Sequence, residues 1–118
     1  MFPCEGYLQL AKNLAAISDE ASMRSAVSRA YYASFHKAKI FAQNNGIKFS
    51  GGKRSEIHKD IVDFLSNNSN INIRLLSTEL DRLRNNRNKC DYADNIKNPK
   101  SIALDAIMGA EEIFNNIT

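Results

Sequence analysis

The stretch ASMRSAVSRAYYASFHKAKIFAQN, residues 21–44, decides the fold class. Its apolar side chains recur every three or four positions, which is the spacing of one helix face, and no segment of the chain shows sustained alternation of apolar and polar residues. The main apolar stripe consists of Met23, Val27, Ala30, Tyr31, Ser34, Ala38 and Phe41. The pattern predicts a long central helix in an all-α protein.

Four further helices are expected around this one. Ser18 or Asp19 is suited to cap the start of the central helix, and Gly46 suits a left-handed conformation at its end. Asn98-Pro99 starts the last helix, because proline fits the first turn of a helix. The other expected helices cover about 6–17, 55–67 and 71–94, and the first is expected to bury Leu8, Leu10, Ala11, Leu14 and Ile17.

Five helices with short connections favour an antiparallel up-down four-helix bundle with one additional short helix. At 118 residues and 43% hydrophobic content, the chain is long enough for one core, so residues 1–118 are expected to form a single domain. Cys4 and Cys90 lack the spacing of a disulfide framework or a zinc site, and both are expected to be free thiols in a reducing cytoplasm. No apolar run is long enough for a membrane span, and no metal or cofactor motif is recognisable.

The charge is distributed unevenly along the chain. The net charge is only +3, yet residues 24–89 carry 13 Lys and Arg against 5 Asp and Glu, while the remainder carries 3 against 8. This basic middle favours an anionic partner such as RNA or a nucleotide, and a set of solvated helix faces is the alternative.

An arginine lies where the core of the fourth helix is expected to continue. The apolar line Ile73, Leu76, Leu80 and Leu83 reaches Arg87 at the same spacing, and Arg84, Arg87 and Asp91 share one face of that helix. Because an unpaired buried charge is very costly, Arg87 must pair with a carboxylate such as Asp91 or open onto a cleft or interface that holds an anion. Both possibilities remain open from these residues.

The central helix carries a second, polar line. Arg29, Tyr32 and His36 follow one another at intervals of three and four, with Tyr31 expected in the core and Tyr32 at its edge. A guanidinium, a phenol and an imidazole on one edge are suited to bind a phosphate or a base, although such residues also occur as satisfied polar groups between helices. His58, near the start of the third helix, is expected at the polar surface.

The segments SRAYYASFHKAKIF (residues 28–41) and LRNNRNKCDYAD (residues 83–94) together resemble the hallmark helices of the HEPN family, the higher eukaryotes and prokaryotes nucleotide-binding domain. The second segment is similar to the family signature L-R-x-x-R-x-x-A-D-Y, and the resemblance extends over roughly residues 7–115. It implies a helical bundle that often dimerises, so that polar residues of the fourth helix from both subunits meet in one cleft. It also implies a possible partnership with a nucleotidyltransferase in a toxin–antitoxin-like pair.

Many members of this family are metal-independent ribonucleases that pair the signature arginine with a histidine a few residues later. Here Tyr92 stands where that histidine is expected, and an unperturbed tyrosine is a poor base at neutral pH. The resemblance therefore leaves two alternatives open. Either His36 of the central helix supplies the missing imidazole to Arg87, or the chain resembles the Asp-Tyr branch of small stand-alone family members, for which binding of a nucleotide or RNA alone is the expectation.

Three functions follow from these patterns. The first is a nucleotide- or RNA-binding homodimer, with Arg87 as the phosphate contact and Asp91 as its orienting partner; its other expected ligand-binding residues are Arg29, Tyr32, Arg84 and Tyr92. The second is a metal-independent endoribonuclease that uses His36 with Arg87. The third is a structural interaction domain whose polar residues serve only packing.

Overall fold

A computed structural model describes residues 3–49 and 51–117 of the chain. The described residues form five helices and no strand: α1 (Glu5–Ala15), α2 (Glu20–Asn44), α3 (Arg54–Ser66), α4 (Ile71–Tyr92) and α5 (Pro99–Asn116). The all-α prediction is confirmed, and each expected boundary lies within about two residues of the observed one, which is the usual uncertainty of a helix end.

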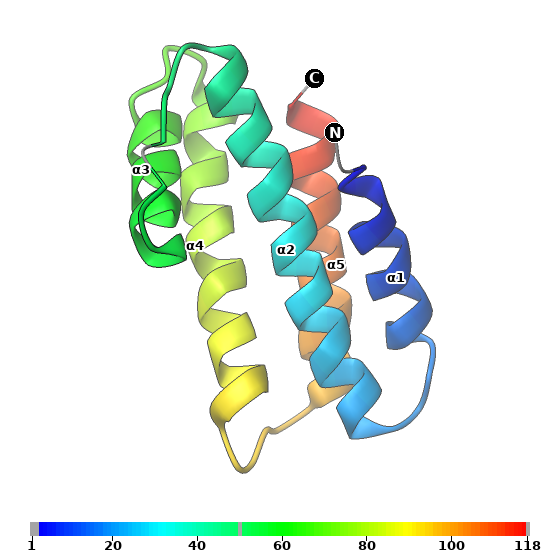
Figure 1. The fold of residues 1–118 in the computed structure, drawn as a ribbon. Helices are drawn as coiled ribbons and strands as arrows, with labels where there is room; N and C mark the ends of the chain where they lie inside the picture. Colours follow the sequence, from blue (N-terminus) through cyan, green and yellow to red (C-terminus); the bar gives the residue numbers. More distant parts are fainter. Residues whose placement is uncertain (1–2, 50, 118) are drawn as a thin grey trace.

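Helix α2 lies at the centre of the molecule. It packs against each of the other four helices, while α4 also packs against α3 and α5, and α1 packs against α5. Figure 1 shows α2 and α5 running in one direction, with α1 and α4 running in the opposite direction beside them. Side chains on several faces of α2 therefore meet different neighbours, and its polar edge lies beside α3 and α4.

Local capping explains where the helices begin and end. Asp19 caps α2, since its Oδ1 accepts a hydrogen bond of 2.7 Å from the backbone N–H of Ser22. Gly46, just after α2, has a φ of 95°, and Asn98 adopts the left-handed conformation directly before Pro99 starts α5. These signals depend on only a few neighbouring residues, so they are readable in the sequence.

The core lies between the helices and is dominated by aliphatic side chains and Tyr31. The largest side chains that are almost fully buried belong to Tyr31, Ile61, Leu65, Leu76, Leu80, Leu83, Ile113 and Val27. Both cysteines are buried and free, and burial raises the pKa of each thiol. In the described part of the chain, no helix combines the length and the apolar character needed to cross a membrane.

The expected buried face of α1 was too wide. Leu10 is 43% exposed and Ile17 is 47% exposed, although both were expected in the core. Helix α1 ends at Ala15 and packs only on α2 and α5, so a narrow stripe of Leu8, Ala11 and Ala15 is sufficient to fill the contact. Leu10 points away from this stripe, and Ile17 lies in the connection that follows the helix.

Candidate anion-binding site

Arg87 lies on the core-facing line of α4, and its side chain is only 18% exposed. Its Nη2 donates to the hydroxyl oxygen of Tyr32 at 2.9 Å, and its Nη1 donates to Oδ1 of Asn88 at 3.1 Å. Its Nε lies 2.9 Å from Oδ2 of Asp91, but this contact is an ion pair without hydrogen-bond geometry. Burial acts to lower the pKa of Arg87, and the contacts with Tyr32 and Asp91 outweigh it, so the pKa is raised and the guanidinium stays charged.

Three guanidinium groups from three helices surround the ring of Tyr32. The Cζ atoms of Arg54, Arg29 and Arg87 lie 4.8, 4.9 and 5.4 Å from the ring centroid. Arg54 of α3 also donates to the Tyr32 hydroxyl oxygen, at 3.0 Å. We call these four residues the Tyr32 cluster. Each cation is attracted to the electron-rich face of the aromatic ring, which helps to hold like charges near one another.

The Tyr32 cluster is poorly neutralised by carboxylates. Only Arg87 has an acidic partner, Asp91, whose Oδ2 also lies 3.4 Å from the Ser28 hydroxyl that donates to it. In residues 3–49 and 51–117, no carboxylate forms an ion pair with Arg29 or Arg54. The three cations lie around one ring, so any two of them are separated by at most about twice the distance from a cation to the ring centroid. At this separation, salt screens their mutual repulsion only in part. The cluster therefore has a local excess of positive charge.

His36 lies beside the Tyr32 cluster and is linked to it through Tyr7 of α1. The Tyr7 ring stacks on the His36 ring with centroids 5.8 Å apart, and its centroid lies 6.1 Å from that of Tyr32. The guanidinium of Arg29 lies 5.7 Å from the Tyr7 ring. Burial lowers the pKa of His36, and the nearby charges of Lys39 and Arg54 lower it further, so the imidazole is neutral at pH 7.

A second chain of polar groups lies beside the cluster; it is buried at Tyr31 and His58 and reaches the surface at Asp81. The Tyr31 hydroxyl lies 2.8 Å from Nδ1 of His58, and Nε2 of His58 lies 2.8 Å from Oδ1 of Asp81. A carboxylate only accepts, so Nε2 carries the hydrogen and Nδ1 accepts from Tyr31. Burial raises the pKa of Tyr31 to about 12 and lowers that of His58, and the charge of Arg84 lowers both values.

The expectation of a surface position for His58 was wrong. Its side chain is 3% exposed, because α3 packs against α4 and turns this residue inward. The sequence shows one histidine among polar neighbours, and nothing in its local pattern indicates that Tyr31 and Asp81 supply its two hydrogen-bond partners. The buried position is a consequence of long-range packing.

The predicted site residues lie in the structure as two groups. Arg29, Tyr32, Arg87 and Asp91 form contacts with one another, whereas the charge of Arg84 acts on the pKa of Tyr31 and of His58. Tyr92 is 75% exposed, and within the described residues no ring contact or hydrogen bond joins it to the Tyr32 cluster. Tyr92 is also among the groups that raise the pKa of Arg87.

Arg54 is the member of the cluster that the sequence analysis missed. It is the first residue of α3 and follows a glycine pair and Lys53, so it resembles an ordinary basic loop residue. Its proximity to Tyr32, 22 positions earlier in the chain, depends on how α3 docks on α2. The only local signal is the basic pair Lys53-Arg54 directly before a helix.

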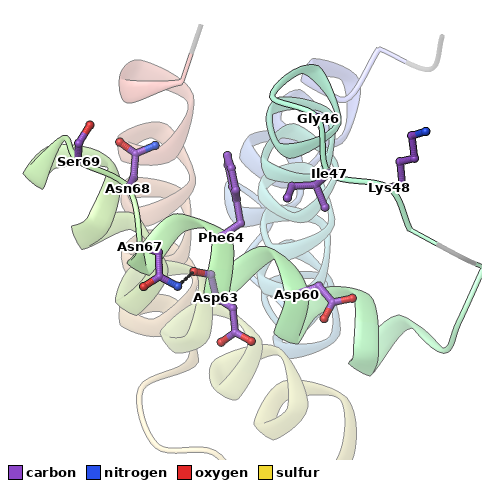
Figure 2. A pocket seen from close by; sticks show the side chains of 9 residues that line it. All are labelled: Gly46, Ile47, Lys48, Asp60, Asp63, Phe64, Asn67, Asn68 and Ser69. Atoms are coloured by element: carbon purple, nitrogen blue, oxygen red, sulfur yellow. Dashed lines mark hydrogen bonds between the residues drawn. The ribbon is translucent and has the colours of Figure 1, made fainter.

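An open hollow elsewhere on the molecule has a different character. It has a volume of about 840 Å³ and lies between the connection after α2 and the end of α3. Figure 2 shows Phe64 in its middle, between Ile47 and Asn68, with Asp60 and Asp63 along the same helix. It contains none of the predicted site residues, and its two carboxylates repel an anion. The Tyr32 cluster is therefore the better anion site.

No family model, no curated protein sequence and no solved structure matches the chain. Within the described residues, no group of three or more His, Cys, Asp and Glu side chains is placed to hold a metal ion.

Proposed function

We propose that the chain binds the phosphate groups of a nucleotide or of RNA at the Tyr32 cluster. The observation that carries this proposal is the convergence of three guanidinium groups on one tyrosine, with a single carboxylate partner among them. Guanidinium forks match phosphate oxygens in shape and charge, and an anion relieves the repulsion among the three cations.

The members of the cluster have distinct roles in this proposal. Arg87 is held by Asp91 and Asn88 and supplies a fixed, partly desolvated charge. Arg29 is half-buried and Arg54 is exposed, so their guanidiniums are the groups that an incoming phosphate reaches first. Tyr32 orients two of the arginines through its hydroxyl oxygen. Tyr92, which is exposed, is available to stack on a base.

We further propose that the chain is a HEPN-like domain, with the five helices arranged as an antiparallel up-down four-helix bundle plus one additional short helix. Two features support this: the alternating directions of α1, α2 and α4, and the resemblance of residues 28–41 and 83–94 to the family patterns. The same resemblance supports a homodimer and a nucleotidyltransferase partner in a toxin–antitoxin-like pair, and the two free cysteines support a reducing, cytoplasmic location.

A direct binding measurement tests the proposed function. A mixed-sequence single-stranded RNA with a 5′-phosphate and a 3′ fluorescent label is titrated with the protein, and binding is followed by anisotropy. Arg87→Ala and Arg54→Ala are each expected to weaken binding by about tenfold or more, the effect of losing a charge-assisted hydrogen bond. Lys100→Gln, which removes an exposed charge on α5, is the matched control and should leave affinity unchanged. Unaltered binding in both arginine variants, with intact folding, excludes this site.

Metal-independent RNA cleavage is the second candidate function. The neutral His36 beside a phosphate-binding arginine cluster favours it, because a general base must be unprotonated at the start of the reaction. Incubation of a mixed RNA pool with the protein and EDTA is expected to yield cleavage that His36→Ala abolishes. If no cleavage occurs under these conditions, the protein is a binding module.

If Arg87→Met is neutral or stabilising and no nucleotide raises the melting temperature, a purely structural interaction domain explains the residues better.

A further inference from the structure

The hydroxyl group of Tyr32 has a hydrogen-bonding capacity that its neighbours leave unused. Its oxygen accepts from Nη1 of Arg54 at 3.0 Å and from Nη2 of Arg87 at 2.9 Å. A phenol oxygen has two lone pairs and one hydrogen, so with two donors bound its remaining capacity is to donate. No described residue accepts a hydrogen bond from it. A ligand at this point therefore meets an O–H donor flanked by guanidiniums.

The cations of the Tyr32 cluster are focused on one point. The guanidiniums of Arg29, Arg54 and Arg87 each lie within 5.4 Å of one ring centroid, and they come from α2, α3 and α4. A surface that follows a nucleic-acid backbone distributes its cations along a groove, because successive phosphates are spaced along the strand. A focused group instead suits one highly charged group on the ligand.

We propose that the Tyr32 cluster recognises a terminal phosphate monoester, such as the 5′-phosphate of an RNA end or of a nucleoside monophosphate, in preference to an internal phosphodiester. This inference rests on the proposed phosphate-binding function and narrows its ligand. A monoester carries close to two negative charges at pH 7 and three terminal oxygens, whereas a diester carries one charge and two such oxygens. The monoester thus offers one more acceptor and nearly twice the charge to the donors of Tyr32, Arg29 and Arg54.

The test compares two RNA oligonucleotides that differ only at the 5′ end. Both have the same sequence and the same 3′ label; one ends in a 5′-phosphate and the other in a 5′-hydroxyl. The phosphorylated oligonucleotide is expected to bind about tenfold tighter, since it gains a charge-assisted hydrogen bond and further charge attraction. Equal affinities overturn the inference while leaving the proposed function intact. Absence of binding by either oligonucleotide overturns both.

Two variants and one control locate the preference within the cluster. Tyr32→Phe keeps the ring but removes the O–H donor, and Arg54→Gln removes an exposed charge without disturbing the core. In each variant, the affinity for the 5′-phosphate oligonucleotide relative to the 5′-hydroxyl oligonucleotide is expected to fall to about a third of its original value or less. Lys100→Gln should leave this ratio unchanged. Arg54→Gln decides the outcome if Tyr32→Phe unfolds the protein. If the ratio is unchanged in Arg54→Gln, other residues distinguish the two oligonucleotides, and the inference is contradicted.

Competition with small nucleotides separates the two sources of the phosphate. AMP, a monoester, and 3′,5′-cyclic AMP, a diester with the same base, are added to the complex with phosphorylated RNA. Displacement by AMP alone shows that the monoester of a free nucleotide is sufficient. Displacement by neither, with the preference for the phosphorylated oligonucleotide retained, assigns the site to an RNA end. Equal displacement by both contradicts the inference.

Discussion

At the scale of single residues, the cost of placing charge near the core decides how Arg87 and its neighbours are arranged. The side chain of Arg87 is 18% exposed and that of Asp91 is 27% exposed, so both are partly removed from water. Such a pair is stable only if its remaining polar atoms also find partners, which Asn88 and Tyr32 supply for Arg87. The arrangement holds the guanidinium in one orientation next to the other two cations.

The pairing of Arg87 with Asp91 predicts non-additive effects on stability. Arg87→Ala is expected to lower the free energy of unfolding by about 1–2 kcal/mol, because it leaves Asp91 without its cation, although the partial exposure of Asp91 limits the loss. The double variant Arg87→Ala/Asp91→Ala should be destabilised by less than the two single variants together. Urea unfolding of the four proteins measures this coupling, and strict additivity would show that the two side chains do not interact.

Tyr31 and His58 predict a second stability effect. Tyr31→Phe removes the donor to Nδ1 of His58, which is buried away from water, and should cost about 1–3 kcal/mol. Tyr7→Phe, a matched change on the half-buried surface of α1, is expected to cost less. Urea unfolding at pH 7.5 or so compares the two variants. If Tyr31→Phe lowers the free energy of unfolding by less than Tyr7→Phe does, the prediction is wrong.

The same histidine predicts a pH dependence with a definite sign. The pKa of His58 is lower in the folded state than its ordinary value of 6.5, so the unfolded chain binds protons more readily as the pH falls through that value. The free energy of unfolding should therefore decrease between about pH 7.5 and about pH 5.5, with His36 acting in the same direction. His58→Gln should show a smaller decrease in urea unfolding. If the decrease is as large as in the original protein, His58 does not cause it.

At the scale of the helices, one arginine at the start of α2 supports the end of α4. Nη1 of Arg24 donates to the backbone carbonyls of Cys90 at 3.1 Å and Ala93 at 2.6 Å, and its Nη2 donates to that of Asp94 at 3.2 Å. The last carbonyls of a helix lack partners within the helix, and a cation is favourable at this negative end of the dipole. The contact ties together two helices that carry the Tyr32 cluster.

This contact predicts a marked difference between two neighbouring substitutions. Arg24→Met keeps an unbranched apolar stem but removes the N–H groups that donate to the three carbonyls, and it is expected to lower the free energy of unfolding by about 1–2 kcal/mol. Glu20→Ala removes only the exposed ion-pair partner of Arg24, and a loss below about 0.5 kcal/mol is expected. Urea unfolding gives both values. Faster amide exchange in residues 90–94 of Arg24→Met would localise the effect, and equal losses in the two variants would refute it.

Helix positions were predictable, whereas the contacts between helices were only partly so. The periodicity of α2 and α4 and the cap at Asp19 are properties of neighbouring residues, and they placed the helix ends within about two residues. Periodicity also placed Arg87 and Tyr32 on inward-facing edges. It did not reveal that Arg54 and His58 of α3 face those edges, since the rotation of a short helix on its neighbours depends on side chains distant in the sequence.

At the scale of the whole molecule, the fold brings arginines from the basic middle of the chain together in one small region. The basic middle of the sequence includes all of α3 and most of α2 and α4, and these are the helices whose arginines meet at Tyr32. The acidic residues outnumber the basic ones in the rest of the chain. The net charge of +3 thus hides a local concentration of arginines at Tyr32, which favours capture of an anion there.

A focused site predicts a shallow dependence of RNA binding on salt. For single strands the slope of log affinity against log salt is about −0.7 for each phosphate neutralised, so one end phosphate with one neighbour gives a slope between about −1 and −2. Anisotropy titrations of the 5′-phosphorylated oligonucleotide at several KCl concentrations measure it. A slope steeper than about −4 would indicate an extended backbone track instead of the Tyr32 cluster.

The sequence by itself determined that the chain is helical, where each helix begins and ends, and that Arg87 faces inward, because helix periodicity and capping act over a few residues. Only the tertiary structure decided which charges meet. Arg54 contacts a tyrosine 22 positions away, and His58 contacts one 27 positions away. Such contacts arise because the apolar faces of α2, α3 and α4 are buried together, and this packing fixes the position and rotation of each helix. The polar groups at the edges of those faces meet only where the packed helices bring them close.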